Sequence, residues 1–156
     1  MNYFNITGNQ KIDNFEATIP ADYSSAAFII LASVINDSEI FIKNLDLNDP
    51  QGDKFILTFL QSIGCKINFE DDGFYIKGEV KKGGVFDLNA TPDLLPVLAI
   101  FASIYPFEFK FHNCLSARYK ETDRIKVAYD LLKSLNVNVV ELNDGLIING
   151  GNIPNN

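Results

Sequence analysis

The pattern of hydrophobic and polar positions predicts the same succession of helices and strands twice along the chain. In each copy a short strand-like stretch leads to an almost wholly apolar helix, then to a strand, a second helix and a β-hairpin. The hairpin turns are marked by Asp71-Asp72-Gly73 in the first copy and by Asn143-Asp144-Gly145 in the second, which are residues that favour tight turns. The pattern therefore predicts an α+β protein built from two tandem βαβαββ units.

The expected elements of the two copies correspond one to one. In the first copy they are Phe15–Ile19, Ala26–Ile35, Glu39–Leu45, Gln51–Ile63, Lys66–Glu70 and Phe74–Lys77. In the second copy they are Val85–Leu88, Leu94–Ile104, Phe107–His112, Thr122–Leu135, Val137–Leu142 and Leu146–Ile148. Asp22 corresponds to Asp93, and Asn44 to Asn113. We expect a connecting segment at 1–14, units at 15–80 and 83–150, and a tail at 151–156.

Composition places the chain among globular proteins and excludes several functions. Of 156 residues, 47% are hydrophobic and 21% are charged, which is typical of a folded domain. The apolar runs are too short to cross a bilayer, and the first residues lack the pattern of a signal peptide. Cys65 and Cys114 match no zinc or redox spacing, so we expect reduced thiols in a cytoplasmic protein. The net charge of −7 argues against nucleic-acid binding.

The segment from Ser116 to Arg124 is the strongest candidate for chemistry. It lies between a predicted strand and a predicted helix and contains Arg118, Lys120 and Arg124. Cations beside a helix N-terminus form a site suited to phosphate or carboxylate groups. Glu121, among these cations, is placed to transfer a proton. The simpler interpretation is a capped helix start whose basic side chains are solvated.

Asp22 and Asp93 occupy equivalent places before the first helix of each unit. One interpretation is that both are helix N-caps, whose side chains accept a hydrogen bond from the backbone. The other is that each presents a carboxylate to a ligand across a cleft. The sequence leaves both interpretations open.

Taken together, these segments resemble the 3-phosphoshikimate 1-carboxyvinyltransferase (EPSP synthase) family. Lys120–Arg124 is similar to the family's Lys-Glu-Ser/Thr-Asp-Arg signature. Asp22–Ala26 is similar to its Gly-Asp-x-Ser-Ser-Ala segment, with Ala21 where glycine is usual. Pro92-Asp93 and Pro50–Asp53 resemble further family motifs in the expected order.

The resemblance implies transfer of the enolpyruvyl group of phosphoenolpyruvate to the 5-hydroxyl of shikimate 3-phosphate, with no metal or organic cofactor. It implies that Asp93 contacts the attacking hydroxyl and that Glu121 transfers a proton at the methylene carbon. Ser116 stands where the family often has asparagine. The substrate-binding residues implied or expected are Lys120, Arg124, Ser116, Arg118 and Asp22.

The family's fold implies two domains of three such units each, with the active site between the domains. This chain would supply two units of the C-terminal domain, and its partners would be the N-terminal domain and the remaining unit. The isolated chain should then fold without turnover, and an exposed apolar edge should favour self-association. Two alternatives are a fragment of a UDP-N-acetylglucosamine enolpyruvyl transferase and a non-catalytic anion-binding or interaction domain.

Overall fold

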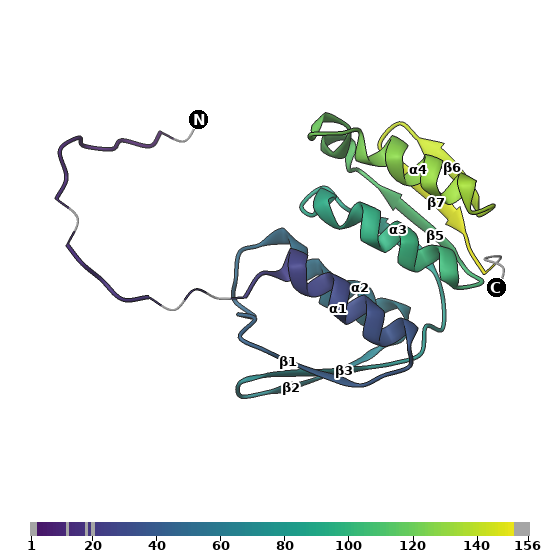
Figure 1. Ribbon diagram of the computed structural model, residues 1–156, viewed down its shortest axis with the longest axis horizontal. Coiled ribbons are helices and arrows are strands. Elements are labelled where there is room, and N and C mark those ends of the chain that lie inside the picture. The colour runs from purple at the N-terminus through teal and green to yellow at the C-terminus, as the bar shows by residue number, and fades with distance from the viewer. Residues whose placement is uncertain (1–2, 12, 18, 20, 152–156) are drawn as a thin grey trace.

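The computed structural model describes residues 3–11, 13–17, 19 and 21–151 (Figure 1). The first unit contains α1 (Tyr23–Ile35), β1 (Ile40–Lys43), the 3-10 helix η1 (Gly52–Lys54), α2 (Phe55–Ile63), β2 (Lys66–Glu70) and β3 (Gly73–Lys77). The second unit contains β4 (Gly84–Asp87), η2 (Pro92–Leu94), α3 (Leu95–Ile104), β5 (Glu108–His112), η3 (Leu115–Tyr119), α4 (Arg124–Ser134), β6 (Asn138–Leu142) and β7 (Gly145–Asn149). The predicted repeat of helices and hairpins is therefore present.

The two units differ in the number of their strands. The second unit has a four-stranded sheet of order β4-β5-β7-β6, in which β4 runs parallel to β5. The first unit has a three-stranded sheet of order β1-β3-β2. Among the described residues, β1 pairs only with β3, so its other edge carries no strand.

The strand predicted at Phe15–Ile19 is wrong for the residues that the structure describes. Residues 15–17 and 19 are neither helix nor strand, and Phe15 is 78% exposed; Thr18 lies outside the described residues. Figure 1 shows residues 3–11 and 13–17 as extended stretches that lie outside the body of the molecule. The stretch offers only two large apolar side chains, whose burial would offset little of the entropy lost on ordering the backbone.

Helix boundaries differ from the predictions where capping or a 3-10 turn intervenes. α1 begins three residues earlier than expected because Asp22 accepts a hydrogen bond from the Ser25 backbone N–H at 2.7 Å. α4 begins two residues later than expected because Asp123 caps it in the same way, through the Lys126 N–H at 2.9 Å. The helix predicted from Gln51 is divided into η1 and α2.

One hydrophobic core joins the two units. Phe59 of α2 packs edge-on against Phe86 of β4 and Phe101 of α3, with ring centroids 4.9 and 5.8 Å apart. Phe109 and Phe111 of β5 complete the aromatic group. Because residues of both units share this cluster, the units form one packed body.

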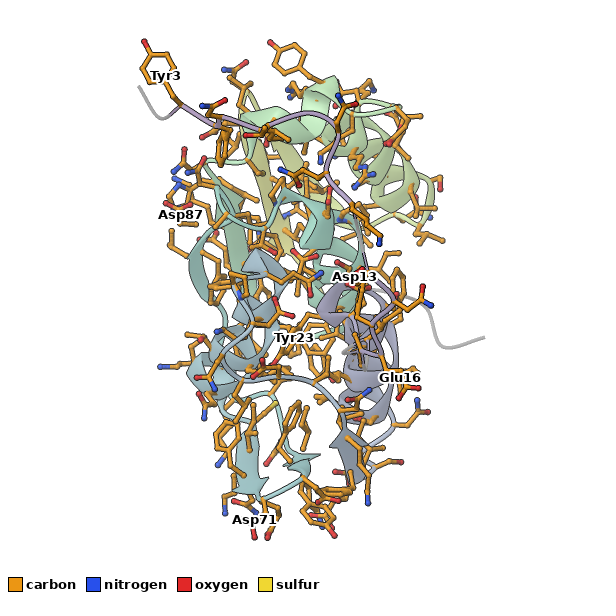
Figure 2. All side chains as sticks on the ribbon, turned by 90° about the vertical axis from the view of Figure 1, so that its left-hand side faces the viewer. Tyr3, Asp13, Glu16, Tyr23, Asp71 and Asp87 are labelled. Atoms are coloured by element: carbon orange, nitrogen blue, oxygen red, sulfur yellow. The ribbon has the colours of Figure 1, made fainter. Side chains whose placement is uncertain are left out.

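The interior contrasts with the ends of the molecule in Figure 2. Tyr23 lies among the packed side chains and is fully buried, and its hydroxyl donates to the Asp46 carbonyl at 3.2 Å. Burial raises the pKa of Tyr23. Asp71, in the β2–β3 turn, lies at the far tip of the same view.

Apolar side chains also remain on the outside of three helices. Figure 1 shows α1, α3 and α4 alongside one another. The exposed apolar residues on them are Phe28, Ile29, Ile35, Ile100, Ile104, Val127 and Leu131, and Leu135 follows directly after α4. Within the described ranges, none of the helices has both the length and the apolar character that crossing a membrane requires.

Candidate active site

The structure brings four of the predicted site residues together at one end of the second unit. Arg124 Nη1 lies 2.6 Å from Asp93 Oδ1, and Lys120 Nζ lies 3.2 Å from the same oxygen. Arg124 Nη2 also contacts Glu121 Oε2 at 3.0 Å. We call Asp93, Lys120, Glu121 and Arg124 the charged cluster. It combines two cations and two carboxylates drawn from η2, from the segment after η3 and from the start of α4.

The structure excludes one of the two interpretations left open for Asp93, that of a helix N-cap. Thr91, not Asp93, is the N-cap residue of η2, and no side chain caps that helix. The Asp93 carboxylate is directed instead to Lys120 and Arg124. Lys120 lies outside α4, which begins only at Arg124, so the two cations do not share a helical face. They meet at Asp93 although Lys120, which follows η3, has an extended backbone.

The loop that carries Lys120 is fixed at its base by a left-handed turn. Asn113 follows β5 with a φ of 60°, a conformation that asparagine tolerates better than most residues. Its N–H donates to Asp144 Oδ2 at 2.8 Å, and its side-chain amide donates to Asp87 Oδ2 at 2.9 Å. Cys114 and Ala117 are then buried in the loop. Asn44 makes the same turn after β1, with a φ of 61°, so the repeat extends to the backbone.

Arg118 is engaged by other residues of its own unit. Its guanidinium donates to Asp123 and Glu141 at 2.8 and 2.9 Å, and to the carbonyls of Asn143 and Leu142, both at 2.6 Å. Only 18% of its side chain is exposed. These bonds tie η3 to the end of β6 and to the turn that follows it.

Asp22 is placed at the start of α1, where it acts as an N-cap. Besides the Ser25 N–H, it accepts a hydrogen bond from Gln51 Nε2 at 2.5 Å. The Gln51 amide, followed by Ser25, lowers the pKa of Asp22 to about 2. Ser116 lies exposed in η3. Both assignments to substrate binding remain predictions.

The pKa of Glu121 lies below the ordinary range of a glutamate. The first cause is a backbone hydrogen bond within Glu121 itself, followed by the hydrogen bond and charge of Arg124 and the charge of Lys120. Glu121 is also the most exposed member of the charged cluster, at 82%. It is therefore an ionised, accessible carboxylate near neutral pH, and a carboxylate in this state can accept a proton.

Sequence reasoning missed a second polar group that lies between the units. Gln51 accepts from the Tyr23 N–H at 2.9 Å and donates to the Ser24 hydroxyl at 3.2 Å as well as to Asp22. Asp53, two residues later, accepts hydrogen bonds from Ser24 and Thr91. Only the resemblance of Pro50–Asp53 to a family motif pointed to this stretch, because its local pattern is that of a helix start. Across the part of the chain that the structure describes, no group of three or more His, Cys, Asp or Glu side chains could hold a metal ion.

Comparison with known proteins supplies the family. The model of the EPSP synthase (3-phosphoshikimate 1-carboxyvinyltransferase) family matches residues 1–155. The chain belongs to the EPSP synthase family. The prediction from the repeat and from Lys120–Arg124 is therefore confirmed.

Individual relatives of the EPSP synthase family agree with this assignment. The chain is 41% identical over 148 residues to the 3-phosphoshikimate 1-carboxyvinyltransferase of Ruminiclostridium cellulolyticum, covering 95% of this chain and 35% of that protein. It is 38% identical over 154 residues to the same-named protein of Methanosarcina acetivorans, covering 96% and 36%. The solved EPSP synthase of Acinetobacter baumannii superposes with a TM-score of 0.73 at 26% identity, covering 85% and 32%. The chain thus spans about a third of the length of these EPSP synthases.

Proposed function

We propose that this chain supplies one face of a 3-phosphoshikimate 1-carboxyvinyltransferase active site, to which the rest of an EPSP synthase supplies the other face. The reaction moves the enolpyruvyl group of phosphoenolpyruvate to the 5-hydroxyl of shikimate 3-phosphate and releases phosphate. The observation that carries the proposal is the charged cluster, in which Lys120 and Arg124 converge on Asp93. Both substrates are anions, so such a reaction needs cations held in place before they arrive.

In this proposal the two cations change partners when substrates bind. In the free chain, Lys120 forms an ion pair with Asp93, and Arg124 forms ion pairs with Asp93 and Glu121. Phosphate and carboxylate groups of the substrates compete for the same N–H donors. As Arg124 and Lys120 turn to the substrates, the Asp93 carboxylate becomes available to the 5-hydroxyl.

The chemical steps then assign one proton transfer to each carboxylate. In the addition step the 5-hydroxyl oxygen bonds to C2 of phosphoenolpyruvate, its proton passes to Asp93, and the methylene carbon takes a proton from Glu121. Glu121 must therefore take up a proton first, as the substrate's negative charge favours. In the elimination step the bond from C2 to the phosphate oxygen breaks, the departing phosphate takes the proton held by Asp93, and the new methyl group returns a proton to Glu121. The product is an enol ether and the leaving group is phosphate.

The first experiment measures whether the chain binds the anionic substrate. Isothermal titration with shikimate 3-phosphate should give binding that Lys120→Ala and Arg124→Ala each weaken by about tenfold or more, as for the loss of a charged hydrogen bond. Lys126→Ala is the matched control, since Lys126 is paired with Asp130 on the same helix, outside the charged cluster. Equal weakening by all three substitutions would point to diffuse charge and contradict the proposal.

The second experiment separates an enzyme from a binding module. We expect no transferase activity from the isolated chain, and turnover once the missing segments of an EPSP synthase are supplied. In the reconstituted protein, Glu121→Gln should retain shikimate 3-phosphate binding but lose turnover. Full activity of the isolated chain would contradict the division of the site. Unchanged turnover in Glu121→Gln would show that its assigned role is wrong, and binding without any turnover on reconstitution would favour the non-catalytic anion-binding domain.

A further inference from the structure

A buried carboxylate links the two units next to the charged cluster. Asp53, in η1 of the first unit, is only 6% exposed. One of its oxygens accepts a hydrogen bond from the Ser24 hydroxyl of the same unit, and the other accepts one from the Thr91 hydroxyl of the second unit. Thr91 is 1% exposed, so its bond to Asp53 is shielded from water.

The backbones of the two units are in contact at the same place. A Cβ atom built on Gly52 would lie 1.8 Å from the carbonyl oxygen of Ala90. No other amino acid fits there unless the units separate, so a glycine allows η1 to reach the segment before Thr91. Asp53 is consequently held at the junction by main-chain packing as well as by its own hydrogen bonds.

The two hydroxyls bound by Asp53 lie two residues from the two predicted site carboxylates. Ser24 follows Asp22 by two positions, and Thr91 precedes Asp93 by two. Gln51, at the start of η1, binds the Asp22 side chain directly at 2.5 Å. The short segment 51–53 therefore holds the first helix of one unit and the Asp93 turn of the other.

We propose that Asp53 is a positioning residue that fixes the Asp93 turn against the first unit and so sets the contacts of Asp93 with Lys120 and Arg124. An apolar residue at a buried position usually gives as much stability as a charged one, or more. A carboxylate differs in that its two oxygens can each accept a bond, here from hydroxyls of separate units. The inference concerns the site of the proposed function and rests on that function for its catalytic meaning.

The test breaks the hydrogen bond while keeping the shape of the residue. Thr91→Val replaces the hydroxyl by a methyl group of similar size, and Thr91→Ser restores the hydroxyl. In the ligand-free chain, the NMR signals of the Arg124 guanidinium and the Asp93 backbone amide should shift in Thr91→Val and return close to wild type in Thr91→Ser. Ser33→Ala is the matched control, because it also removes a buried hydroxyl, but that hydroxyl donates to the Ile30 carbonyl within α1 of the first unit.

A second measurement on the same variants determines their affinity for shikimate 3-phosphate. We expect Thr91→Val to bind it about tenfold more weakly than wild type and Thr91→Ser to bind it within about twofold. Ser24→Ala, on the less buried side of Asp53, should give the same shifts if Thr91→Val does not fold. Arg124 and Asp93 signals unchanged in the folded variants would overturn the inference. If the wild type does not bind the probe, the proposed function fails, and the ligand-free signals still decide the role of Asp53.

Discussion

The two units share one order of elements, yet equivalent residues in them do different things. Asp22 and Asp93 stand at the same place in the repeat, but Asp22 caps α1 while Asp93 forms ion pairs with Lys120 and Arg124. The second unit also has a fourth strand, β4, whose counterpart in the first unit is an exposed segment. A repeat thus conserves the scaffold, while its side chains and edges diverge to make one unit the carrier of the charged cluster.

Among the substitutions considered, one in the fourth strand should have the largest effect on the free energy of unfolding. Phe86 of β4 is 9% exposed and packs against Phe59, Phe109 and Phe111. Phe86→Ala should lower the free energy of unfolding by about 3 kcal/mol, because it leaves a cavity in the shared core. Phe15→Ala, at the corresponding place in the first unit, should leave it almost unchanged. Urea unfolding followed by circular dichroism measures both.

The same two variants also test whether the first unit really lacks a packed counterpart of β4. A hollow of about 320 Å³ lies between α1 and β1, lined by apolar atoms of Ala26, Ile29 and Ile42 among others. A loss of more than about 1 kcal/mol in Phe15→Ala would mean that the segment packs on the first unit in solution. The first unit would then also have a packed segment in the place of β4, and the contrast between the two units would be wrong.

A substitution at Arg118, in the loop that carries Lys120, should have the next largest effect on stability. Arg118 holds η3 to β6 through two carboxylates and two carbonyls. Arg118→Ala should destabilise the chain by about 2 kcal/mol, since it leaves those acceptors without their donor. Its control in the first unit is Lys43→Ala, which removes an exposed pair with Asp72 and should change little.

Arg118→Lys refines this second prediction. Lysine keeps the charge but loses the planar fork that reaches four oxygens. We expect stability between those of Arg118→Ala and wild type in thermal unfolding. Equal stability of the alanine variant and wild type would show that Arg118 is available to ligands, as the sequence suggested, and does not hold the loop.

The sequence carried enough information for the scaffold but not for its edges. The periods of two and 3.6 residues and the turns at Gly73 and Gly145 located the hairpins and helices to within a few residues. The strand at Phe15–Ile19 was predicted from the repeat, and pattern alone cannot show whether a short edge segment gains enough from pairing. Helix starts moved because the capping bonds of Asp22 and Asp123 depend on local geometry.

The Lys120–Arg124 motif was enough to predict three residues of the charged cluster, but their contact with Asp93 follows from the fold. Lys120, Glu121 and Arg124 are close in sequence, so their proximity could be expected. Their meeting with Asp93 depends on how η2 packs against η3, which no local pattern reports. Asp53 and Thr91 are 38 positions apart. A buried bond over that separation is visible only in three dimensions.

The exposed apolar residues of the helices predict a modest effect on association. Phe28 and Ile29 of α1 are each 63% exposed. We expect concentration-dependent self-association in size-exclusion chromatography with light scattering, reduced by Phe28→Glu. Val85→Glu is the control, since Val85 on β4 is exposed to a similar degree, 66%. A monomer at every concentration, or equal effects of both substitutions, would contradict the involvement of the helix face.

The smallest expected effect concerns the capping role of Asp22. Its pKa of about 2, held down first by Gln51 and then by Ser25, lies below the ordinary value of 3.8. The contribution of Asp22 to stability is therefore fully present above pH 3.8 and is lost as the pH falls through about 2. Because the side chain is exposed, the change in unfolding free energy should be slight, and the titration itself is the better measurement. In a carbon-13 titration of the carboxyl groups, Gln51→Ala should move the Asp22 midpoint up toward 3.8, while Gln61→Ala on the exposed face of α2 should not. An Asp22 midpoint that stays near 2 in Gln51→Ala would assign the low pKa to the helix start alone and would contradict the role given to Gln51.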